Sequence, residues 1–202
     1  MEKTSVDRVT LLNITIIVEA CLLLVATVWA QVSSISLPLN MVPHFKQIAI
    51  GVGAGTLTAA ISLLLFRLGK SVDALAPLRE IVFKTLVPMF SETRVLDLIV
   101  VAALSGFCEE VFFRGIVQSQ FGLFIAALAF GLFHDPTFRH VPYAILAFLS
   151  GLFLGWLYIV TGNLWVPITA HIVHNLISLY ILRFKIKPPD NPLEDSTSVK
   201  AP

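Results

Sequence analysis

Long apolar runs, separated by short polar stretches, set the pattern of this chain. A helix that crosses a membrane needs about 20 mostly apolar residues. Runs of this kind cover residues 11–30, 47–66, 95–117, 121–134, 141–160 and 166–182, of which the fourth is short. The pattern predicts an all-α fold, a polytopic membrane helix bundle of about six transmembrane helices.

Two further stretches differ from these runs. Residues 70–90 mix large apolar side chains with Asp73, Arg79, Glu80 and Lys84, a composition that suits an amphipathic segment at the membrane interface. Residues 187–202 are rich in Pro, Ser, Asp and Glu and have little to bury, so we expect a disordered tail. The remainder, residues 1–186, is expected to form one bundle.

Composition agrees with a lipid environment. Of the 202 residues, 56% are hydrophobic and 13% are charged, against about 25% charged in a typical soluble domain. The mean hydropathy is +0.86. The formal net charge of +1 gives no reason to expect a nucleic-acid partner.

The basic residues predict an orientation. Lys3 and Arg8 precede the first run, several Lys and Arg follow the second, Arg139 follows the fourth, and Arg183, Lys185 and Lys187 follow the sixth, whereas the alternate connections contain one Lys or none. Because such residues favour the cytoplasmic side, we expect both termini to be cytoplasmic. The sequence Val28-Trp29-Ala30 also leaves open that the first run is a cleaved signal segment.

Ionisable residues inside a membrane span are costly and mark function. The third run holds three within six residues: Glu109, Glu110 and Arg114. Glu110 and Arg114 are four apart and can pair on one helix face, while Glu109 is turned away by about 100°. We therefore expect Glu110 to be held by Arg114 and Glu109 to be a free carboxylate that acts as a general base. An ion pair that merely joins helices remains the structural alternative. Glu19, in the first run, is expected to be paired or near a cavity.

Two other runs supply imidazole and amide groups. His134 ends the fourth run, and the sixth contains His171 and Asn175 four residues apart. Glu109 with His134 would deprotonate a water, and His171 with Asn175 would donate hydrogen bonds to an oxyanion. His134, at the inner end of a short run, is expected about 10 Å nearer the cytoplasm than Glu109, so a shared site requires a tilted helix or different boundaries.

These residues resemble three motifs of one known family. Residues 109–114 resemble EExxxR, residues 130–134 resemble FxxxH, and residues 171–175 resemble HxxxN of the CAAX protease and bacteriocin-processing (CPBP or Abi) family. The resemblance covers about residues 91–182. It implies an intramembrane endopeptidase of glutamate type. In this chain the implied catalytic residues are Glu109, Glu110, Arg114, His134, His171 and Asn175.

The resemblance leaves several functional questions open. The implied substrate is a membrane-associated protein or peptide: a prenylated tail, a leader peptide or a C-terminal sorting signal. We expect no cofactor, although two His and a Glu also suit zinc. A transporter with a proton relay is the alternative function. The expected location is a prokaryotic cell membrane, and the oligomeric state is open.

Overall fold

The computed structural model describes residues 6–37, 42–135 and 140–187, and within these the regular structure is entirely helical. The helices are α1 (Arg8–Val32), α2 (Phe45–Leu68), η1 (Asp73–Leu75), α3 (Ala76–Ile81), η2 (Val82–Leu86), α4 (Val87–Phe90), α5 (Val95–Glu110), η3 (Val111–Val117), α6 (Gln118–His134), α7 (Val141–Thr161) and α8 (Trp165–Phe184). Four of them, α1, α2, α7 and α8, are long and apolar enough to cross a membrane. The predicted helical membrane bundle is confirmed; the predicted tail lies almost wholly outside the described residues.

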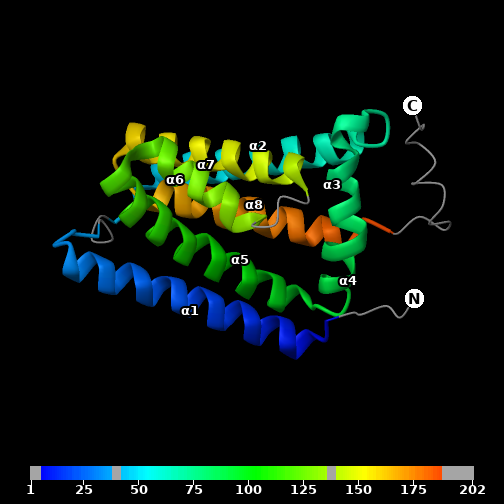
Figure 1. The fold of residues 1–202 in the computed structure, drawn as a ribbon, viewed down its shortest axis with the longest axis horizontal. Coiled ribbons are helices and arrows are strands. Elements are labelled where there is room, and N and C mark those ends of the chain that lie inside the picture. The colour runs from blue at the N-terminus through cyan, green and yellow to red at the C-terminus, as the bar shows by residue number, and fades with distance from the viewer. Residues whose placement is uncertain (1–5, 38–41, 136–139, 188–202) are drawn as a thin grey trace.

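The long helices lie side by side, and α8 is the central one (Figure 1). It contacts α2, α5 and α7, while α1 packs on α5 and α6 packs on α7. The segment from η1 to α4 lies across one end of the bundle, where the sequence predicted an interfacial amphipathic segment (Figure 1). It buries Leu78, Ile81 and Phe90 and pairs the exposed Glu80 with Lys84 at 2.8 Å.

The beginning of α1 is tied to the first turn of α5, and the end of α8 is tied to the residue before the N-cap of α5. Arg8 donates two hydrogen bonds to Asp97, at 2.5 and 2.6 Å, and Asp97 also accepts one from the backbone N–H of Arg94. Arg183 donates to the carbonyl of Thr93 at 3.1 Å. The first and last described helices therefore begin and end, respectively, at the same end of the bundle.

Small residues allow the central helices to approach closely. A Cβ at Gly51 or Gly55 of α2 would collide with α8, and one at Gly151 of α7 would press on Ala127 of α6. Gly53, on another face of α2, has nothing within 4 Å of the position of a Cβ. Gly51, Gly55 and Gly151 therefore serve packing within the bundle.

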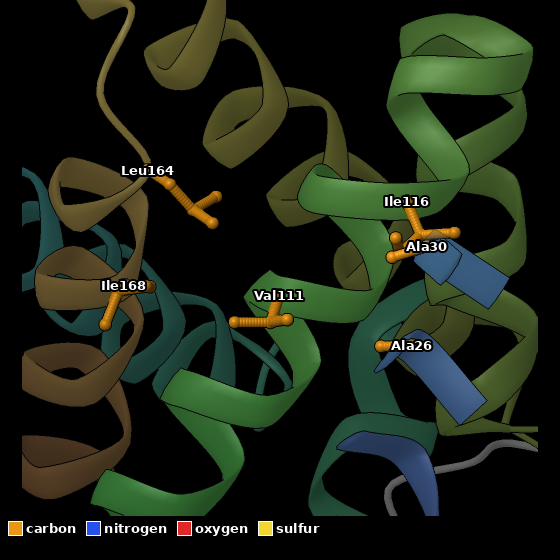
Figure 2. Packing of buried hydrophobic residues seen from close by; sticks show 6 residues of the cluster. All are labelled: Ala26, Ala30, Val111, Ile116, Leu164 and Ile168. Atoms are coloured by element: carbon orange, nitrogen blue, oxygen red, sulfur yellow. The ribbon is translucent and has the colours of Figure 1, made fainter. Parts of the chain in front are cut away.

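At the other end of the bundle, an apolar cluster joins α1, η3 and the start of α8 (Figure 2). Ala26 and Ala30 of α1 pack in this cluster with Val111 and Ile116. Trp29 adds an edge contact to Phe112, with ring centroids 6.3 Å apart. Together with the Arg8–Asp97 pair, this cluster fixes α1 against α5 and η3 at both ends.

The turn between the third and fourth predicted runs determines the depth of the site. η3 is π-helical and continues α5, so the two form one helix over the predicted residues 95–117. Gly122 then has φ 82° and ψ 171°, which breaks α6 near its start. Only a residue without a Cβ adopts this backbone conformation readily, so Gly122 lets the chain turn back along the bundle.

Candidate active site

Glu110 is the centre of a buried polar network. Its Oε1 accepts a hydrogen bond from Nη1 of Arg114 at 2.8 Å and lies 2.9 Å from Nδ1 of His171 on α8. Glu110 and Arg114 have 0% and 1% of their surface exposed. The Arg114–Glu110 pair was expected, whereas the bond from His171 to Glu110 was not. Glu110 therefore joins η3 and α8 through a single carboxylate.

Arg114 also reaches α6 and α7. Its Nη2 donates to the carbonyl of Gly151 at 3.0 Å, and its guanidinium lies 4.6 Å from the centre of the Phe130 ring. The planar, forked guanidinium suits such simultaneous contacts. Phe130 lies against the imidazoles of His134 and His171 as well, with ring centroids 4.4 and 5.8 Å away. The network thus holds the two histidines around one aromatic ring.

The π-helical turn of η3 is part of this arrangement. It begins directly after Glu110 and contains Arg114. π-Helical turns are rare and occur frequently at functional sites. Just after this turn, Ser119 Oγ lies 2.9 and 2.7 Å from the carbonyl oxygens of Gly115 and Ile116, and its single O–H donates to this pair.

Glu109 points toward His134 instead. The distance between Glu109 Oε2 and His134 Nε2 is 3.8 Å, longer than a hydrogen bond. Glu109 Oε2 is buried and has no hydrogen-bond partner within the described part of the chain. His134 Nδ1 lies 2.8 Å from the carbonyl of Phe130, which can only accept, so Nδ1 carries a proton. In the neutral imidazole, Nε2 then presents its lone pair toward Glu109.

The expectation that His134 lies about 10 Å shallower than Glu109 is wrong. From Glu109 the chain runs 13 residues to Gly122 and then returns 12 residues to His134. At about 1.5 Å per residue the two distances are nearly equal, so the side chains return to the same depth. α6 therefore ends at the level of Glu109, and His134 Nε2 lies 3.8 Å from Glu109 Oε2.

Asn175 and His174 follow His171 on α8 and form hydrogen bonds with two different helices. Asn175 Nδ2 donates to Ser105 Oγ at 2.9 Å, one turn before Glu109 on α5, and Ser105 in turn donates to the carbonyl of Val101. The second N–H of the Asn175 amide is left for another acceptor. His174 pairs with Thr58 of α2 at 3.0 Å, so it is bonded away from the carboxylates.

A close contact of backbones brings these side chains together. A Cβ at Gly106 would lie 2.5 Å from a side-chain carbon of Ile172 and 2.8 Å from its backbone nitrogen. Gly106 therefore permits α5 and α8 to touch where Glu109 and Glu110 meet His171. Any larger residue would separate the carboxylates from the imidazole.

A cavity of about 400 Å³ connects the site with the end of the bundle where α3 and α4 lie. Its polar lining residues include His134, Tyr143, His171, His174 and Asn175. Its walls are otherwise mostly apolar. They come from α2, the α3–α4 segment, α7 and α8 and include Leu63, Phe66, Leu78, Leu86, Met89 and Leu182. The cavity can hold an apolar chain whose polar end reaches the site.

Two contributors escaped the sequence analysis. Ser105 is not among the residues predicted for the site, although it anchors Asn175. Tyr143 lines the cavity with its ring 6.4 Å from that of His134, and no sequence signal marks it, because it comes from the start of another helix. Among the described residues, no group of three or more His, Cys, Asp or Glu side chains is placed to hold a metal ion.

Comparison with known proteins agrees with the motifs. Residues 91–177 match the family model described as type II CAAX prenyl endopeptidase Rce1-like. The uncharacterized protein YpbD of Bacillus subtilis (strain 168) is 34% identical over 101 residues, which cover 48% of this chain and 51% of that protein. No solved structure matches. The family resemblance is thereby confirmed for the segment that carries Glu109, His134 and His171.

Proposed function

From the premise that residues 91–177 are an Rce1-like segment, we propose that the protein is an intramembrane endopeptidase of glutamate type. It hydrolyses a peptide bond in a membrane-associated protein or peptide. The observation that carries this proposal is the gap of 3.8 Å between Glu109 Oε2 and His134 Nε2. Both atoms are acceptors, and one water molecule lying beside them, within hydrogen-bond distance of each, would donate to both.

Glu109 acts as the general base in this mechanism. It takes one proton of the water while His134 Nε2 accepts a hydrogen bond from the other, and the oxygen attacks the carbonyl carbon of the peptide bond. The proton on Glu109 then passes to the leaving nitrogen as the C–N bond breaks. The products are a free carboxylate and a free amine, so the reaction needs only water.

Asn175 and His171 face the developing oxyanion. Asn175 has one N–H fixed by Ser105 and a second available to the substrate, and both residues line the cavity. His171 donates from Nδ1 to Glu110 and, as an imidazolium, from Nε2 to the oxyanion. Such preorganised donors stabilise the transition state in a site from which water is excluded. Glu110 and Arg114 act by holding His171 and the helices in place.

The shape of the cavity supports a substrate with an apolar portion. Its apolar walls extend from the site to the end of the bundle with the α3–α4 segment. The matched family is described as prenyl endopeptidases, and a prenylated tail is therefore the first substrate to test. Leader peptides and C-terminal sorting tails are the other two candidates.

The test uses the full chain reconstituted in liposomes with one peptide of each candidate class. We expect cleavage by the wild type, at least 100-fold less by Glu109→Ala and His134→Ala, and wild-type rates for Glu80→Gln, whose carboxylate lies at the surface. Hydrolysis in ¹⁸O-labelled water must place one ¹⁸O in the new carboxylate. Equal cleavage by Glu109→Ala would reject the mechanism, and loss of activity with a chelator, restored by zinc, would favour the metal-dependent alternative.

A further inference from the structure

A third buried carboxyl group lies in the bundle outside the matched segment. Glu19 of α1 is 6% exposed, whereas its neighbours Val18 and Ala20 are exposed on the outer face of the helix. Its Oε2 has no hydrogen-bond partner among the residues that the structure describes. A carboxyl group buried in this way is costly, so its position calls for an explanation.

The register of α1 against α5 places Glu19 at the level of Glu109. The two helices lie side by side and run in the same direction (Figure 1). The Arg8–Asp97 pair fixes their starting points. Glu19 lies 11 residues beyond Arg8, about 17 Å along the helix, and Glu109 lies 12 residues beyond Asp97, about 18 Å.

Apolar contacts above and below confirm this register. Leu11 of α1 belongs to one cluster with Leu98 and Val101, and Ala26 belongs to another with Val111 (Figure 2). Glu19 lies between these two levels. It therefore faces the turn of α5 that ends in Glu109.

The charged and titratable neighbours come from three elements. Glu109 and Cys108 of α5 and His171 of α8 are within electrostatic range of Glu19. Arg114 of η3 acts on Glu109. Two carboxyl groups that share apolar surroundings resist being ionised together. His171 acts on both carboxyl groups, and Glu110 and Arg114 act on Glu109 in opposite directions, so the single negative charge is assigned to Glu109 because that residue is the general base of the proposed mechanism.

We propose that Glu19 is a positioning residue for the general base, a neutral carboxyl that donates a hydrogen bond to Glu109, directly or through a water molecule. This inference rests on the proposed proteolytic function. While Glu19 keeps its proton, it orients the ionised Glu109 without adding charge. When Glu19 loses this proton at high pH, the second negative charge opposes both Glu109 and the developing oxyanion.

A glutamine imitates the neutral form of Glu19, and a leucine does not. The amide of Glu19→Gln still donates a hydrogen bond but cannot ionise. We therefore expect Glu19→Gln to keep near wild-type cleavage at neutral pH, and its activity to persist about one pH unit or more beyond the pH at which the wild type declines. Glu19→Leu loses the donor and should lower kcat about tenfold or more, with little change in KM.

The experiment measures cleavage from pH 5 to 10 by the full chain in liposomes. Asn13→Leu, at an exposed position of the same helix, is the control for removing a polar group from α1. Cys108→Ser controls for ionisation of the neighbouring thiol and must keep the alkaline decline. Thermal unfolding in detergent reports folding of each variant separately.

Three results would overturn the assignment of Glu19. In the first, the cleavage rate of Glu19→Gln declines at the same alkaline pH as that of the wild type. In the second, the wild-type cleavage rate does not decline up to pH 10. In the third, Glu19→Gln loses as much cleavage activity as Glu109→Gln. A purely structural Glu19 would move the unfolding temperature but not the pH profile. Cleavage by Glu109→Gln at the wild-type rate would instead reject the proposed function itself.

Discussion

Arg114 donates a hydrogen bond to Glu110 over 2.8 Å although both side chains are shielded from solvent almost completely. The pair belongs to one helix, yet each partner bonds a different neighbour. Arg114 reaches the carbonyl of Gly151 on α7, and Glu110 accepts from His171 on α8. The pair therefore connects three elements, and its loss affects the bundle as well as the site.

Arg114→Met should destabilise the protein by about 3–5 kcal/mol, because it leaves the carboxylate of Glu110 buried without its cation. The double variant Arg114→Met with Glu110→Gln should cost less than the two single changes added together, since no unpaired charge remains. Thermal and denaturant unfolding in detergent measures the loss of stability in the single variants and in the double variant. Additive losses would show that the two side chains do not interact.

Gly106→Ala should separate α5 from α8 and lower the cleavage rate at least tenfold, because the added methyl group meets the backbone of Ile172. The matched control is Gly53→Ala on α2, where a methyl group meets nothing within 4 Å. Cleavage by the control should equal that of the wild type. Similar losses in both variants would mean that helix flexibility, not this contact, is responsible.

Asn175→Ala should lower kcat by about 10²–10³ with a small change in KM, because one preorganised donor to the oxyanion is lost. Ser105→Ala should have a smaller effect in the same direction, since it removes only the anchor of the amide. Steady-state kinetics with a fluorogenic peptide separates kcat from KM. A change confined to KM would assign Asn175 to substrate binding.

Ser178→Phe should fill part of the cavity and raise KM for a substrate with a long apolar chain more than for a short one. Tyr180→Trp, at an exposed position on the same helix, is the matched control and should leave the KM unchanged for both the long-chain and the short-chain substrate. The measurement compares peptides that carry lipid chains of different length. Equal KM values for both chain lengths in Ser178→Phe would place the apolar part of the substrate elsewhere.

The sequence by itself determined the helical elements and the pairing of residues within one helix. Apolar runs of spanning length fix membrane helices because lipid offers no partner for free backbone groups, and the predicted run 95–117 is one continuous helix in the structure. The spacing of Glu110 and Arg114 likewise predicts their pair, since residues four apart share a helix face. Both inferences depend on local geometry alone.

Only the tertiary structure decided how groups from different helices meet. The return of His134 to the depth of Glu109 depends on the backbone of Gly122, and the bond from His171 to Glu110 depends on the contact at Gly106. The pairing of α1 with α5, which brings Glu19 toward Glu109, depends on the ion pair of Arg8 with Asp97 and on the apolar clusters that contain Leu11 and Ala26. These contacts join residues far apart in the chain, and the helical period carries no information about which helix faces which.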